Sequence, residues 1–256
     1  GYGLDLYLRS ESDLTKVLAG SEGTLAMVAS AELGLSPLPM QKGLCLIYVN
    51  SIPDAAHATL DILDLKPAAV ELIDDILWES TRGQIAFKET RALLGLDDHP
   101  CKAILIVEFF EDIDDRIAQL SRRDIGVRKL VVTDAREMEM VWALRKAGLS
   151  LLTGCKGSSK PVPGIEDVAV PPQRLPDYVN GLLGIFDRLG LEGSFYGHAA
   201  SGLLHVRPVL DLHRAEDVAR YRQVSDEVAA LVLQVKGSVS AEHGVGIGHT
   251  EYMPEH

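Results

Sequence analysis

The sequence predicts an α+β fold, a sheet with helices layered on it. Three observations carry this prediction. Strand-like and helix-like segments alternate from Gly43 onward, two of the alternations form strand–helix–strand units of the ferredoxin-like kind, and every apolar run is too short to span a bilayer. At 256 residues the chain is long enough to bury a sizeable core. We therefore expect a layered domain without a transmembrane segment.

Elements of the first half are assigned from periodicity and from the residues that begin or end them. A short helix is closed by Gly20, a second begins after Pro53, and Pro37 with Pro39 marks a boundary. The last helix of this half carries Arg145 and Lys146 at its end, where the helix dipole favours cations. The predicted strands are 25–29, 31–35, 44–49, 68–73, 103–109 and 128–132, and the predicted helices are 13–20, 54–63, 112–121 and 134–146, with a helical hairpin over 74–95.

The second half begins with a Gly, Ser and Pro-rich segment, 154–164, that packs poorly and turns easily. We predict a loop over the functional site here. An amphipathic helix over 173–188 and a long helix over 215–236 follow from apolar spacing. The predicted strands of this half are 167–170, 194–200, 203–207 and 238–241.

Charge and cysteine content limit the class of partner. The formal net charge is −12 and no basic run stands out, which argues against nucleic acid or an anionic membrane as the partner. Cys45 and Cys101 lie in apolar runs and Cys155 in a loop, without a C-x-x-C pair. This usage predicts reduced thiols and a cytoplasmic protein. Association of the whole protein with the periphery of an inner membrane stays open.

The N-terminus predicts an excised piece of a longer protein. The sequence begins Gly1-Tyr2-Gly3 without Met, and the segment from Gly20 to Leu25 is typical of the end of an earlier fold. We expect residues 1–40 to be the C-terminal remnant of one domain and residues 41–256 to form another.

Two histidines flank a predicted tight turn. The Ser201-Gly202 pair lies between two strand-like runs, which is the spacing of a two-residue hairpin. Counting outward from the turn, His198 faces His205 with Cβ atoms about 5 Å apart. This separation suits two ligands of one metal ion, and Tyr196 would point the same way as His198.

A second chemical cluster is the pair Glu242-His243 before three spaced glycines. These glycines do not form a dinucleotide fingerprint, because the required strand, helix and distant acid are absent. Two imidazoles and one carboxylate, His198, His205 and Glu242, suit Zn²⁺ or Mn²⁺ with an open position for substrate. The sequence also lacks the H-E-x-x-H and G-x-S-x-G motifs of hydrolases.

These motifs resemble a known family over nearly the whole chain. The quoted stretches are Gly20-Ser21-Glu22-Gly23-Thr24-Leu25, Glu166-Asp167-Val168-Ala169-Val170-Pro171, the run from Gly197 to His205, and Glu242-His243-Gly244. Their order and spacing are similar to those of FAD-linked oxidases of the vanillyl-alcohol-oxidase-like group, in particular glycolate oxidase and D-2-hydroxyacid dehydrogenases acting on D-lactate or D-2-hydroxyglutarate. The resemblance implies the C-terminal substrate or cap domain of such a flavoenzyme, with FAD held mainly by a missing N-terminal domain.

The resemblance also implies roles for individual residues. It assigns His198, His205 and Glu242 as metal ligands, His243 as the base that takes the hydroxyl proton of a small 2-hydroxy acid, and Arg145 as the clamp of the substrate carboxylate. Ser21, Glu22, Gly23 and Thr24 match the flavin-contacting end of the first domain. Lys160, in the mobile loop, is a further candidate cation for the substrate, and Tyr196 a candidate lining residue.

Departures from the family pattern leave alternatives open. Ala200, Ser201 and Leu203 replace the usual Gly, Asp and Asn, a variant similar to long fused members that carry an iron–sulfur domain. A docking module for such an electron-transfer partner therefore remains one hypothesis, and a metal-dependent hydrolase is another. Each proposed substrate contact also has a purely structural interpretation. Arg145 could be a cation that stabilises a helix end, Lys160 could be a solvated loop lysine, and Tyr196 could be a core side chain.

Overall fold

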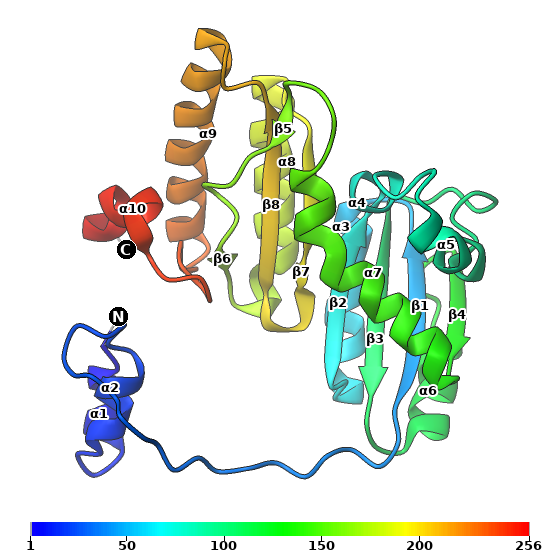
Figure 1. Cartoon of the computed structure of the whole chain (residues 1–256), viewed down its shortest axis with the longest axis horizontal. Coiled ribbons are helices and arrows are strands. Elements are labelled where there is room, and N and C mark those ends of the chain that lie inside the picture. The colour runs from blue at the N-terminus through cyan, green and yellow to red at the C-terminus, as the bar shows by residue number, and fades with distance from the viewer. Residues whose placement is uncertain (1, 256) are drawn as a thin grey trace. The chain divides into compact units, whose positions relative to one another are not determined.

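A computed structural model describes residues 2–255 and divides the chain into two compact units, Gly1–Leu38 and Pro39–His256 (Figure 1). The first unit contains helices α1 (Leu4–Arg9) and α2 (Leu14–Ala19). The predicted helix over 13–20 is confirmed, because Asp13 caps α2 by accepting the N–H of Thr15 and Gly20 follows its last residue.

The two strands predicted over 25–29 and 31–35 are wrong. Both segments are extended chain without a ladder partner among the described residues. Their large apolar side chains are open to solvent, and Met27 and Leu35 are 96% and 92% exposed. Apolar composition alone does not make a strand when no neighbouring strand offers hydrogen bonds.

The second unit contains the sheet, in which the neighbouring strands are antiparallel. Its order is β4-β1-β3-β2-β7-β8-β5, with β6 paired to β8 off this path. The first four strands come from two strand–helix–strand units, which confirms the ferredoxin-like units expected from the alternation. These elements are β1 (Gly43–Val49), α3 (Ile52–Ile62), β2 (Ala69–Asp74), β3 (Ala103–Phe109), α6 (Ile113–Ser121) and β4 (Arg128–Val132).

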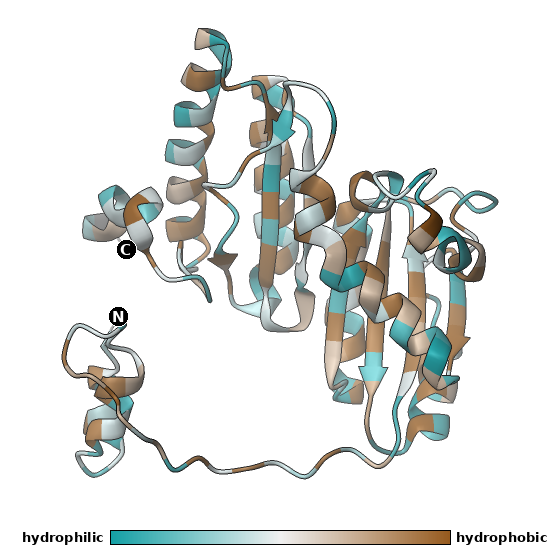
Figure 2. Ribbon diagram, viewed as in Figure 1, coloured by the Kyte–Doolittle hydropathy of each residue, from teal (hydrophilic) through white to brown (hydrophobic). Residues whose placement is uncertain are grey.

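Helices cover both faces of this sheet. In β1, Cys45 and Ile47 belong to one buried cluster with α3 and α6, whereas Leu44 and Leu46 belong to another with α7. This arrangement explains why the central strands are apolar on both faces, as their colouring in Figure 2 shows. The helices on the second face are α4 (Asp75–Glu79), α5 (Lys88–Leu94) and α7 (Ala135–Thr153).

Helix α7 extends seven residues beyond its predicted end at Lys146. Gly148 lies inside it, and a Cβ there would lie 2.9 Å from the Leu77 side chain. Gly148 therefore permits close packing against α4 and does not end the helix. The buried residues Leu151 and Leu152 hold the added turns in place.

The remaining elements complete the sheet and the first helical layer. Helices α8 and α9 contribute to the same buried cluster as α3. The elements are β5 (Lys160–Pro161), β6 (Val168–Ala169), α8 (Leu175–Leu189), β7 (Gly193–His198), β8 (Leu203–Leu210), α9 (Ala215–Gln234) and α10 (Gly246–His249), with 3-10 turns at Leu63–Leu65, Ile85–Phe87, Pro172–Arg174, Ala199–Ser201 and Thr250–Glu255. Among residues 2–255, every helix is too short or too polar to cross a bilayer.

The strand predicted over 238–241 is wrong. Ser238 makes a single bridge to Ala169, and the chain after it is a loop. Its amides at Ala241 and Glu242 donate to the carboxylate of Asp167 and not to a neighbouring strand.

Asp74, at the end of β2, joins β2, α4 and β7. Its carboxylate accepts the N–H of Leu77 at 3.0 Å, the N–H of Phe195 at 2.6 Å and the hydroxyl of Ser194 at 2.9 Å. Burial raises the pKa of Asp74 to about 7, although these donors oppose the shift.

This pKa predicts a pH-dependent stability. The folded-state pKa lies above the unfolded value of about 3.9, so the contribution of Asp74 is complete below about pH 4 and is lost as the pH rises through about 7. The free energy of unfolding of the protein, relative to that of Asp74→Asn, should fall over this interval in denaturant titrations. A difference that stays constant with pH would contradict the assignment.

Candidate metal and substrate site

The hairpin that carries both histidines differs in register from the prediction. His205 lies opposite Tyr196, and the turn is a 3-10 turn over Ala199–Ser201 closed by Gly202 at φ +73°. The expected pairing of His198 with His205 is therefore wrong, because the turn takes more residues than Ser201-Gly202. Gly202 is required there, since a Cβ would lie 1.9 Å from the carbonyl oxygen of Val170.

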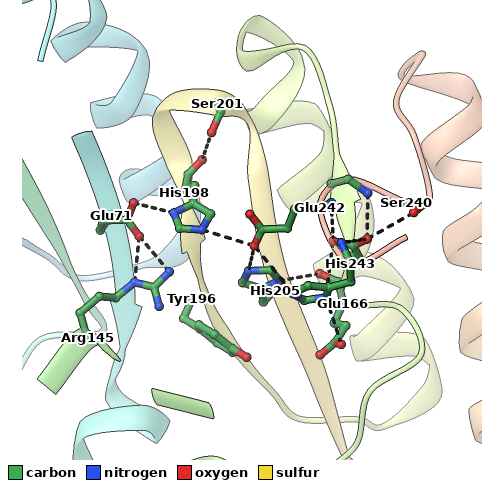
Figure 3. Close-up of polar contacts among 12 residues, drawn as sticks. Glu71, Arg145, Glu166, Tyr196, His198, Ser201, His205, Ser240, Glu242 and His243 are labelled. Atoms are coloured by element: carbon green, nitrogen blue, oxygen red, sulfur yellow. Dashed lines mark hydrogen bonds and ion pairs between the residues drawn. The ribbon is translucent and has the colours of Figure 1, made fainter. Parts of the chain in front are cut away.

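The two imidazoles nevertheless converge with the Glu242 carboxylate (Figure 3). Oε1 of Glu242 lies 3.4 Å from Nε2 of His198 and 3.1 Å from Nε2 of His205. Ligands about 2.0–2.2 Å from a tetrahedral ion lie about 3.4 Å from one another. The donor set and its spacing therefore fit a divalent ion, and the structure brings together all three residues predicted as ligands.

Both histidines have their other ring nitrogen next to an oxygen. Nδ1 of His198 lies 2.6 Å from Oε1 of Glu71, and Nδ1 of His205 lies 3.3 Å from the carbonyl oxygen of Glu166. A proton on each Nδ1 satisfies these contacts and leaves each Nε2 lone pair for a metal.

The two histidines have different proton affinities. The hydrogen bond that His198 donates to the Glu71 carboxylate raises the pKa of His198, although burial opposes the shift. Burial lowers the pKa of His205, so that imidazole is held neutral, the form that coordinates metal.

Glu71 connects His198 to Arg145. It lies opposite His198 across the β2–β7 pairing, and its Oε2 accepts from Nε and Nη2 of Arg145, both at 2.8 Å. One edge of the Arg145 guanidinium, which is predicted to bind the substrate carboxylate, is therefore already paired with Glu71. Within residues 2–255 no hydrogen bond or ion pair involves Nη1 of Arg145, and its guanidinium carbon lies 5.4 Å from the ring centroid of Tyr196.

His243 lies beside the three candidate ligands. Its ring stacks on His205 with centroids 5.0 Å apart and planes inclined by 9°. Nε2 faces Oε1 of Glu242 at 3.7 Å, and Nδ1 lies 3.6 Å from carboxylate oxygens of both Glu166 and Asp167. Its side chain is 48% exposed, so the ring is reachable from solvent.

A buried arginine adds a second guanidinium to this face. Arg207 of β8 forms an ion pair with Glu166 and donates from Nε to the hydroxyl of Tyr196 at 3.1 Å. Burial raises the pKa of the Tyr196 phenol, so that it stays protonated near neutral pH.

Sequence reasoning did not assign roles to Glu71, Asp167 or Arg207. Glu71 is the single charge in the apolar strand segment Ala-Val-Glu-Leu-Ile, and Arg207 follows His205 at the same-face spacing of a strand. A charged residue within a predicted buried strand is therefore the signal that could have identified Glu71 and Arg207.

Lys160 lies outside the cluster of His198, His205 and Glu242, and the residues predicted to contact the flavin belong to the first unit. Lys160 pairs with Leu210, five residues along β8 from His205, which corresponds to about 16 Å of strand, and its ammonium donates to the carbonyl of Cys155. Ser21, Glu22, Gly23 and Thr24 form a turn in the first unit, in which the Thr24 hydroxyl donates to the Ser21 carbonyl at 2.6 Å.

Comparison with known proteins identifies similar sequences and folds. The model of the family described as "FAD linked oxidases, C-terminal domain" matches residues 38–256. The chain is 34% identical over 272 residues to D-2-hydroxyglutarate dehydrogenase of Haemophilus influenzae, with 96% of this chain and 26% of that protein covered. It is 28% identical to glycolate oxidase subunit GlcD of Bacillus subtilis, with 94% of this chain and 50% of that protein covered.

The fold is also found among solved structures. That of 4-ethylphenol oxidase from Gulosibacter chungangensis aligns with a TM-score of 0.54 at 13% identity, over 85% of this chain and 49% of that one. The likeness at this identity concerns the fold alone. The chain thus spans about a quarter to a half of the length of the relatives named here.

Proposed function

We propose, from the premise that the chain belongs to the family of FAD-linked oxidase C-terminal domains, that it is the substrate- and metal-binding domain of an FAD-dependent oxidoreductase. The proposed reaction is oxidation of the CH–OH group of a small 2-hydroxy acid. The observation that carries the proposal is the convergence of Nε2 of His198, Nε2 of His205 and Oε1 of Glu242, with each Nδ1 held by an oxygen.

In this proposal His198, His205 and Glu242 hold Zn²⁺ or Mn²⁺. The chemistry that the ion supplies when bound is Lewis acidity, which lowers the pKa of a coordinated hydroxyl. Glu71 and the Glu166 carbonyl keep the two imidazoles in the tautomer that presents Nε2.

His243 is the proposed general base. Its Nε2 faces the ligand cluster, so this nitrogen would receive the proton of the substrate hydroxyl. The carboxylates of Glu166 and Asp167 lie 3.6 Å from Nδ1, so a proton on Nδ1 would face these oxygens and leave Nε2 as the accepting nitrogen.

Arg145 and Tyr196 are the proposed contacts of the substrate. The Arg145 edge that Glu71 leaves open can donate to a carboxylate, and the Tyr196 phenol can donate beside it. Lys160 has no part in the proposal, because it lies in β5 and pairs with Leu210, five residues along β8 from His205.

The chemistry that FAD supplies when bound is acceptance of a hydride from the substrate α-carbon. We propose that a preceding domain binds most of the FAD and that residues 1–40 are the end of that domain. Ser21, Glu22, Gly23 and Thr24 are the proposed flavin contacts on this chain.

Metal content tests the proposal directly. After equilibration with Zn²⁺ and dialysis, the protein should retain about one ion per chain by elemental analysis, whereas His198→Ala should bind at least tenfold more weakly. His213→Ala is the matched control, because His213 is exposed and pairs with Asp211 outside the cluster. Equal retention by all three proteins would remove the metal site and, with it, the proposed function.

A further inference from the structure

The loop that carries Glu242 and His243 is held by one buried carboxylate. Asp167, 1% exposed, accepts three backbone N–H groups: Ala241 at 2.8 Å, Glu242 at 3.1 Å and His243 at 3.1 Å. The hydroxyl of Ser240 lies 3.4 Å from the same carboxylate. The loop amides converge on this anion as they do in a backbone anion nest.

Apart from these backbone amides, residues 241–243 contact the rest of the domain through the side chains of Glu242 and His243. These residues are exposed and belong to no strand, and the last ladder contact before them is the bridge between Ala169 and Ser238. The Glu242 side chain reaches the histidines from this loop, whereas both histidines belong to the hairpin of β7 and β8 and the turn that joins them. The position of Glu242, the third proposed ligand, therefore depends on the position of the loop.

We infer that Asp167 is a positioning residue that sets the geometry of the metal site through the loop backbone, without being a ligand. Its carboxylate faces groups of the loop: Oδ2 receives the amides of Ala241 and His243, Oδ1 receives that of Glu242, and Nδ1 of His243 lies 3.6 Å from Oδ1. A carboxylate with its acceptor sites filled in this way competes poorly as a metal ligand, so the alternative grouping of Asp167, His205 and His243 is the weaker metal site.

The residue before Asp167 supports the same division of roles. Glu166, the preceding residue, turns its carboxylate to Arg207 and its carbonyl to Nδ1 of His205. Consecutive residues thus hold two parts of the site, with Glu166 orienting the hairpin histidine and Asp167 placing the loop. The inference rests on the proposed metal site and extends it by one residue.

The experiment compares two buried aspartates with similar partners. Asp167→Asn replaces an acceptor by an N–H₂ group that cannot receive the loop amides, and Asp74→Asn does the same for Leu77 and Phe195 outside the cluster. We expect Zn²⁺ affinity, measured by competition with a chelator, to fall 10–100-fold in Asp167→Asn. Asp74→Asn should stay within twofold of the unaltered protein, although its stability changes.

A double-mutant cycle separates positioning from general damage. If Asp167 acts through Glu242, Asp167→Asn should have no further effect on Zn²⁺ affinity in the Glu242→Ala background. Additive losses, an equal loss in Asp74→Asn, or unchanged affinity in Asp167→Asn would each overturn the inference. Should Asp167→Asn fail to fold, Ala241→Pro removes one donated N–H from the exposed loop and should lower Zn²⁺ affinity at least tenfold, and unchanged affinity would again overturn it.

Amide hydrogen exchange tests the same inference without metal. Protection at Ala241, Glu242 and His243 should be lost in Asp167→Asn and kept in Asp74→Asn. Retained protection in Asp167→Asn would overturn the inference even if Zn²⁺ binds. Failure of the unaltered protein to bind Zn²⁺ would instead remove the proposed metal function, and the exchange result would still decide whether Asp167 holds the loop.

Discussion

Replacement of His243 by glutamine, in an FAD-loaded protein that includes the proposed FAD-binding domain, should lower kcat by about 10²–10⁴-fold, the usual contribution of a general base. Glutamine is of similar size and keeps a polar end, but it cannot take the hydroxyl proton. Nε2 of His243 faces the proposed ligands and its Nδ1 faces two carboxylates, so the imidazole is oriented to accept the proton at Nε2. Steady-state kinetics with a 2-hydroxy acid and flavin reduction in single turnovers would measure the loss.

The matched control for this substitution is His213→Gln, an exposed histidine outside the cluster. Its kcat should be unchanged, and Zn²⁺ affinity of His243→Gln should stay within about threefold, because His243 is not among the three proposed ligands. Full turnover by His243→Gln would contradict the assignment of the base and would favour the docking-module hypothesis raised by Leu203.

The sequence was sufficient to predict the core of the sheet because its signals there are local. Strands 103–109 and 128–132 match β3 and β4 at both ends, since each is a short apolar run between turn or helix signals. The prediction was wrong where the formation of a strand depends on a neighbouring strand that can pair with it. Segments 25–29 and 31–35 have the apolar composition of strands, but among the described residues no neighbouring strand pairs with them.

The same distinction holds within the site. The three proposed ligands could be chosen from motifs, but the register of the hairpin could not, because a turn over Ala199–Ser201 cannot be distinguished by composition from a two-residue turn. Glu71 lies 127 residues before His198 and meets it only through the pairing of β2 with β7. Such a contact depends on the order of strands in the sheet, which a single sequence does not specify.

Glu71→Gln is expected to weaken both the fold and the metal site. The substitution removes the charge that pairs with Arg145, itself only 12% exposed, and loss of one partner of a buried ion pair costs about 3 kcal/mol. It also removes the carboxylate that fixes Nδ1 of His198, so Zn²⁺ affinity should fall about 10–100-fold. Chemical denaturation and chelator competition measure the two effects separately.

The two effects of Glu71→Gln have different causes, and a second substitution separates them. Adding Arg145→Met removes the unpaired guanidinium, so the double variant should regain stability relative to Glu71→Gln while its Zn²⁺ affinity stays low. Asp97→Asn is the matched control, because it weakens the ion pair of another buried arginine, Arg91, away from the histidines, and should leave Zn²⁺ affinity unchanged. If Asp97→Asn lowered that affinity as much as Glu71→Gln, the loss would reflect general destabilisation, and Glu71 would have no specific link to His198.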